Sequence, residues 1–139
     1  MRGRGLTRFI AVRLLSGYVW LALGSAVILF ARGLVPGTAS YDAALHAIAL
    51  GFVFSMVFGH APIILPAVLR VAVRYHPTFY VPLALLHGSL ALRLAGDAAG
   101  QFDWVRAGGM LNALALAAFI VGTLSAVVRG RRAARSTGR

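Results

Sequence analysis

Apolar residues in this chain gather in four long runs separated by short polar, glycine- or proline-containing linkers. The runs lie near residues 14–34, 43–69, 78–95 and 104–128. A membrane-spanning helix needs about 20 mainly apolar residues, and each run comes close to or exceeds that length. Short linkers favour antiparallel neighbours. The pattern therefore predicts an all-α fold, an integral membrane four-helix bundle in one domain covering residues 1–139.

The composition agrees with a membrane protein. The chain is 60% hydrophobic and 12% charged, with a mean hydropathy of +0.83, which is too apolar for an ordinary soluble domain. The sequence has no cysteine, which excludes disulfides, thiolate metal sites and iron–sulfur clusters.

Arginine placement predicts the orientation of the helices. All fourteen basic residues are arginines. Nine lie in the terminal segments, including a basic tail at 129–139, and Arg70 and Arg74 lie in the second linker. Only Arg32, Arg93 and Arg106 would lie on the other side. Because cytoplasmic loops are enriched in basic residues, we expect both termini in the cytoplasm and a bacterial or archaeal plasma membrane location. This topological role is favoured over nucleic-acid binding, so the expected partner is the lipid bilayer.

Three of the four histidines, His46, His60 and His87, fall inside the apolar runs. An ionisable side chain at membrane depth is costly and usually functional. Neutral imidazole is a common ligand of haem iron and of copper. These histidines are therefore the candidate cofactor or metal ligands, and interhelical hydrogen bonding is the competing interpretation.

The histidine spacing suggests more than one site. His46 and His60 are fourteen residues apart, which in an ideal α-helix gives about 40° of rotation and about 21 Å of separation. They would then share a stripe but not a metal centre. His60 and His87 come to similar depths and could bracket one haem, within a protomer or across an interface. Arg70 and Arg74 could contact haem propionates, although the positive-inside rule explains them equally well.

Other residues in the runs have structural interpretations. Asn112 predicts an interhelical hydrogen bond. Pro62 and Pro66 predict a kink just past His60. The repeat of small residues at every fourth position predicts close helix packing or, less favoured, a flat macrocycle lying against glycine; its members are Ala47, Gly51, Ser55 and Gly59. We place all three acids outside the spans, which argues against a proton-coupled transporter.

The segment ALHAIALGFVFSMVFGHAPIILP resembles the histidine-bearing helices of the haem–copper oxidase subunit I superfamily and its NnrS-type relatives. The resemblance implies that His46 and His60, and His87 with them, are haem or metal ligands. It also implies that three copies of a four-helix unit rebuild a twelve-helix ring, hence a homotrimer. A dimer is the alternative, by analogy with dihaem cytochrome b bundles. The chain lacks the adjacent histidine pair and the His–Tyr pair of a binuclear centre.

These observations predict a small membrane protein that binds haem b for electron transfer or for haem or gas sensing. The alternatives are a copper- or metal-binding protein, with a role in oxidase assembly, and a non-catalytic structural subunit. We identify no catalytic residue.

Overall fold

The computed structural model describes residues 2–31, 33–69 and 80–137, and nearly all of them are helical. The elements are α1 (Arg2–Phe30), α2 (Ala39–His46), η1 (Ala47–Val53), α3 (Phe54–Leu69), α4 (Tyr80–Ala99) and α5 (Phe102–Thr137). No strand occurs in this described part of the chain. The all-α prediction is confirmed.

Three helices are long and apolar enough to cross a membrane, namely Thr7–Phe30, Ala39–Ala61 and Phe102–Gly130. They correspond to the first, second and fourth predicted spans. Residues 80–95 of the third run form most of α4, which does not reach the same apolarity within the described residues. Helix α5 continues through the basic segment from Arg129 as far as Thr137.

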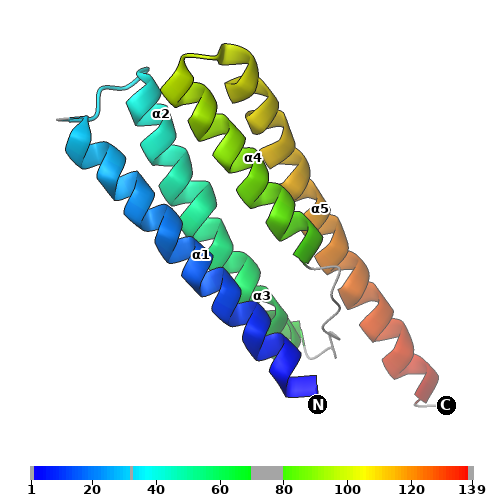
Figure 1. The fold of residues 1–139 in the computed structure, drawn as a ribbon. Helices are drawn as coiled ribbons and strands as arrows, with labels where there is room; N and C mark the ends of the chain where they lie inside the picture. Colours follow the sequence, from blue (N-terminus) through cyan, green and yellow to red (C-terminus); the bar gives the residue numbers. More distant parts are fainter. Residues whose placement is uncertain (1, 32, 70–79, 138–139) are drawn as a thin grey trace.

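The helices lie side by side along a common direction (Figure 1). The start of α1 and the end of α5 lie at one end, and the turn between α4 and α5 lies at the other. That turn is only two residues long, and Gly100 adopts a φ of +65° there, a conformation that glycine tolerates best. At the start of α2, the Thr38 hydroxyl accepts a hydrogen bond from the backbone N–H of Tyr41, as an N-cap residue does.

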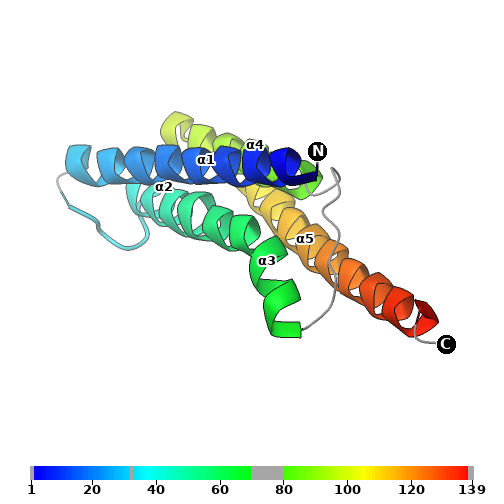
Figure 2. The same ribbon diagram turned by 90° about the horizontal axis from the view of Figure 1, so that it is seen from below.

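The second run is a single helical rod whose middle section is a π-helix. Seven residues, Ala47–Val53, have the wider π turn between α2 and α3. His46 and His60 were predicted to share a stripe because an uninterrupted α-helix would join them. The π-helix between them has hydrogen bonds that span five residues instead of four, so the rotation calculated for an α-helix does not apply. The last turns of α3 point away from the direction of η1 (Figure 2), in the segment that contains Pro62 and Pro66. This bend agrees with the predicted kink.

Two apolar clusters hold the helices together. Phe58, Leu86, Ala115 and Phe119 join α3, α4 and α5, and the Phe58 and Phe119 rings stack with centroids 3.6 Å apart. Trp20, Ala47 and Leu90 join α1, η1 and α4. The predicted role of Asn112 is confirmed, because its Oδ1 accepts a hydrogen bond from the Ser89 hydroxyl across α4 and α5.

Candidate functional site

His60 has the chemistry expected of a metal-ligating histidine. Its Nδ1 lies 2.8 Å from the carbonyl oxygen of Met56, one turn earlier on α3. A carbonyl only accepts, so Nδ1 carries the proton and the lone pair is on Nε2. Metal-ligating histidines commonly donate their other ring N–H to a backbone carbonyl or a carboxylate. The backbone of α3 therefore fixes His60 in the tautomer that can bind iron or copper.

The exposed His60 ring lines a groove of about 400 Å³ between α3 and α5. Its walls are almost entirely apolar, and the other lining residues are Val57, Ala61, Ile64, Phe119, Ile120, Thr123 and Leu124. The volume is within the range of small-molecule and cofactor pockets, about 300–1,000 Å³. The groove therefore presents a single histidine nitrogen on an otherwise largely apolar surface.

His87 has the opposite arrangement. The indole Nε1 of Trp20 donates a hydrogen bond to Nδ1 of His87 at 2.8 Å, and the planes of the two rings differ by 13° with their centroids 6.2 Å apart. Because tryptophan is only a donor, Nδ1 uses its lone pair in this bond and the neutral ring carries its proton on Nε2. His87 in this state has no lone pair to offer a metal. A ligand role would require the Trp20 bond to break.

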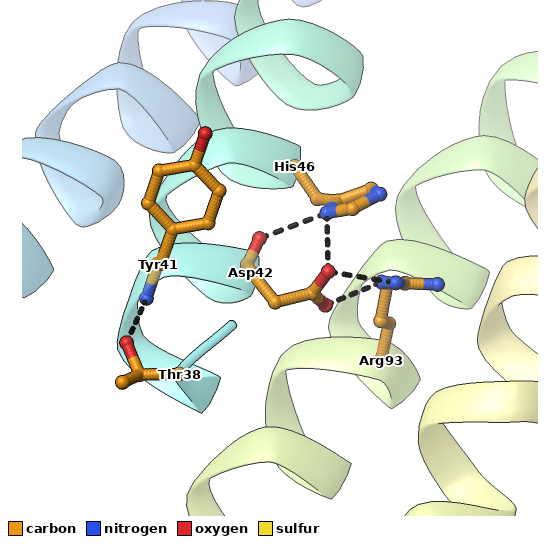
Figure 3. Close-up of polar contacts among 5 residues, drawn as sticks. All are labelled: Thr38, Tyr41, Asp42, His46 and Arg93. Carbon is orange, nitrogen blue, oxygen red and sulfur yellow. Dashed lines mark hydrogen bonds and ion pairs between the residues drawn. The ribbon is translucent and has the colours of Figure 1, made fainter. Parts of the chain in front are cut away.

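His46 belongs to a polar cluster where α2 meets α4 (Figure 3). Its Nδ1 lies 2.8 Å from the Asp42 backbone oxygen and 3.2 Å from Asp42 Oδ1. This again leaves the lone pair on Nε2. The same Asp42 carboxylate accepts two hydrogen bonds of 2.9 Å from Nε and Nη2 of Arg93. One carboxylate therefore orients His46 and ties α2 to α4.

Glycines on α5 make room for Arg93. A Cβ atom added to Gly108 would lie 2.8 Å from the Arg93 Cβ, and one added to Gly109 would lie 2.6 Å from its Nη1. Larger residues at either position would push the arginine from its place. The sequence predicts Arg93 on the non-cytoplasmic side and all three acids outside the spans, and it does not predict their pairing. Asp42 lies inside the candidate span Ala39–Ala61, and Asp103 lies inside the candidate span Phe102–Gly130. The prediction that all acids fall outside the spans is therefore wrong for these two residues.

A second carboxyl group adjoins this cluster from the last turn of α4. Burial and the neighbouring Asp42 carboxylate together raise the pKa of Asp97 from 3.8 to about 6, while Arg93 opposes them. Asp97 also lines a groove of about 430 Å³ near the ends of α1, α2 and α4. This group therefore changes charge in the physiological pH range, which no sequence motif indicated.

Arg13 is a further polar residue whose burial was not predicted from the sequence. It was assigned to the basic N-terminal segment, yet the structure buries its side chain completely. Its guanidinium carbon lies 3.8 Å from the centroid of the Phe9 ring and 5.4 Å from that of Phe58. These are cation–π distances. The signal for its burial was its position only one residue before the first apolar run.

The small-residue stripe packs inside the chain. A Cβ at Gly24 would lie 3.3 Å from that of Ala47, and one at Gly17 would lie 3.4 Å from that of Ser55. Gly51 lies against Trp20. The packing interpretation is confirmed, since α1 fills the face on which a flat macrocycle was the alternative.

The structure does not bring the predicted ligands together within one chain. His60 opens on the α3–α5 groove, His87 bonds to α1, and His46 lies in the α2–α4 cluster. Arg70 and Arg74 lie outside the described residues. Within the ranges that the structure describes, no group of three or more histidine or acidic side chains is placed to hold a metal ion.

The fold and composition define an all-helical protein with three helices suited to a lipid bilayer. The chain belongs to the family described as a domain of unknown function, DUF8744, whose model matches residues 1–128. Comparison with curated proteins and with solved structures gave no match.

Proposed function

We propose that this protein binds haem b in the membrane, with His60 as the residue that would hold the iron, and serves electron transfer or haem or gas sensing. The observation that carries the proposal is the His60 tautomer: Met56 holds the Nδ1 proton, so the Nε2 lone pair is available beside an apolar groove. Haem iron accepts such a nitrogen, and the reversible one-electron chemistry of iron is what the cofactor supplies when bound. The residues of this chain supply the ligand and a low-dielectric, water-poor surface.

The groove also favours a homo-oligomer. His60 is exposed and is the only nitrogen ligand among the residues that line the groove. A second copy facing the groove would supply a second His60 and cover the apolar walls. The proposal therefore includes a homo-oligomer. A trimer follows from the resemblance to the oxidase family, and a dimer follows from the pairing of two copies of His60.

The topology that goes with this function has four spans and both termini in the cytoplasm. The start of α1 and the end of α5 lie at one end of the helices (Figure 1), as an even number of crossings requires. In this arrangement the run at 78–95 is the third span, in a bacterial or archaeal plasma membrane. Its polar groups contact other helices, since Arg93 binds Asp42 and Ser89 binds Asn112. Such pairing lowers the cost of polar groups at membrane depth.

His46 is the second candidate ligand. The Asp42 carboxylate and carbonyl hold its Nδ1 proton in the same way, and a carboxylate partner strengthens an imidazole as a ligand. Copper is the alternative metal for either histidine, with oxidase assembly as the corresponding role, and a purely structural subunit is the remaining alternative.

The test is a reduced-minus-oxidised absorption spectrum with haem and metal analysis on one purified sample. We expect a Soret band and reducible α and β bands that His60→Ala abolishes or shifts. His87→Ala is the matched control, since it also removes a membrane-embedded imidazole but should leave the bands in place. Copper without a Soret band would support the metal-binding alternative, and a protein free of both from haem-replete cells would overturn the proposal.

A further inference from the structure

Three side chains share the carboxylate of Asp42 where α2 meets α4. Arg93 donates two hydrogen bonds of 2.9 Å to it, and Nδ1 of His46 lies 3.2 Å from its Oδ1 (Figure 3). The third neighbour is Asp97, one turn after Arg93 on α4, whose carboxyl group is close enough to Asp42 for a side-chain hydrogen bond. Two carboxyl groups therefore meet between α2 and α4.

Two carboxyl groups in hydrogen-bond contact must hold a proton between them. An ionised carboxylate only accepts hydrogen bonds, so one member of the pair has to be the O–H donor. Arg93 identifies the donor, because its paired hydrogen bonds favour the ionised form of Asp42. The proton is therefore on Asp97. The Oδ2 atom of Asp97 is buried and receives no hydrogen bond from the described residues, which costs less for a neutral carboxyl group than for a carboxylate.

An ionised Asp97 would have little positive charge to balance it. The charged or titratable groups on the helices around it are Asp42 and His46 of α2, Arg93 of α4, and the exposed Asp103 and Arg106 of α5. Helix α1 lines the groove beside Asp97 with Val27, which is apolar. Only Arg93 and His46 among these residues lower the pKa of Asp97, and Arg93 already bonds to Asp42. Burial and Asp42 outweigh them and raise that pKa to about 6. Loss of the proton therefore places two like charges side by side.

The packing around this contact allows one end of α4 to move away from α2. Toward the middle of the helices, Trp20, Ala47 and Leu90 pack α1, η1 and α4 together. Beyond the contact, α4 stays with α5, because a Cβ on Gly96 would lie only 2.8 Å from the backbone nitrogen of Val105. The joined ends of α4 and α5 can therefore swing from α2 as one unit, with the apolar cluster as the pivot.

We infer that this contact is a proton-operated switch, in which a proton on Asp97 holds α4 against α2 through Asp42, and loss of the proton lets the end of α4 separate from α2. The structure shows the closed state. The switch lies at the end of the helices that carries the α4–α5 turn, away from the two termini (Figure 1). In the topology proposed above, that end faces the outside of the cell, so the switch senses external pH. Only this location rests on the proposed topology, and the switch itself is independent of haem binding at His60.

Because the sequence has no cysteine, spin labels can be attached at chosen positions. Nitroxides on Leu45→Cys in α2 and Ala95→Cys in α4, both at exposed positions, report the separation of the two helices by pulsed electron paramagnetic resonance. In the full chain in detergent we expect a second, longer distance whose share grows with pH, with a midpoint near pH 6. Since Asp97 is partly exposed, the ratio of the longer to the shorter distance should change about fivefold.

The Asp97→Asn variant decides the assignment. Its amide N–H can donate to Asp42 as the protonated carboxyl group does, and it has no proton to lose in this pH range. The shorter distance should therefore persist at every pH. Asp103→Asn is the matched control, because it removes an exposed carboxylate from the first turn of α5 and should keep the pH response of the parent.

Two results would overturn the proposal. A distance distribution that stays the same from pH 4 to pH 8 in the parent would show that the α2–α4 contact does not respond to protonation. A pH response that persists in Asp97→Asn would assign the titration to another group of the cluster, such as His46. The first result can be read from the parent alone, so the test stands even if Asp97→Asn does not fold.

Discussion

Replacing Asp97 with asparagine should stabilise the protein above pH 6 and leave it nearly unchanged near pH 4. The pKa of Asp97 is raised from 3.8 to about 6 in the folded state by burial and by the Asp42 carboxylate. The folded protein therefore holds this proton to a higher pH than the unfolded chain does. Wild-type stability falls as the pH rises from about 4 to about 6, and the penalty then stays constant.

The size of the effect follows from the pKa change. Each pKa unit corresponds to about 1.4 kcal/mol, so the full shift sets an upper limit of about 3 kcal/mol. Asp97 is partly exposed, and solvent screening reduces this to about 1 kcal/mol. Asp97→Asn removes the charge with little change of shape. Its advantage over wild type should grow between pH 4 and pH 6 and level off at about 1 kcal/mol.

The assay is reversible unfolding of the detergent-solubilised protein at a series of pH values from 4 to 8. Asp103→Asn is the control, because Asp103 is exposed in the first turn of α5 and lacks the Asp42 neighbour. It should show no comparable pH-dependent gain. A constant difference between Asp97→Asn and wild type across the series would refute the account of burial and carboxylate repulsion at this position.

Three further substitutions test the packing and polar contacts. Gly51→Ala should destabilise the protein by about 1–3 kcal/mol because its methyl would meet the Trp20 ring, whereas Gly88→Ala, which has open space, should be neutral or slightly stabilising in the same denaturation assay. Asn112→Leu should cost about 1 kcal/mol through the lost bond to Ser89, and an unchanged midpoint would show that this bond is dispensable. Arg93→Lys should lower stability by about 1–2 kcal/mol, since lysine cannot make the paired contact with Asp42, and equal stability would contradict the importance of that geometry.

Helix positions and close packing were predictable from local sequence. Apolar runs of membrane length predicted the helices, and a small residue at every fourth position predicted a face that another helix approaches closely. Asn112 followed the same logic, since a lone amide among apolar residues needs a partner on a neighbouring helix. These features depend on composition and period, which the sequence displays directly.

The polar contacts between helices were not predictable in the same way. Trp20 and His87 are 67 residues apart, and Asp42 and Arg93 are 51 apart. Their pairing depends on which faces of the helices meet. The π-helix at Ala47–Val53 changes which faces of the second run meet its neighbours. No pattern of glycine or proline in the sequence predicts this π-helix. The tautomers of the histidines depend in turn on these contacts. From the sequence, both His60 and His87 are candidate ligands, although their hydrogen bonds give them opposite chemistry.

The most direct test of the central proposal is the haem content and reduced-minus-oxidised spectrum of His60→Ala and His87→Ala, purified in parallel from haem-replete cells with the wild-type protein. The account predicts haem and reducible α and β bands in wild type and His87→Ala, and their loss or shift in His60→Ala. The same spectrum in all three proteins, or a loss confined to His87→Ala, would contradict the assignment of His60 as the ligand.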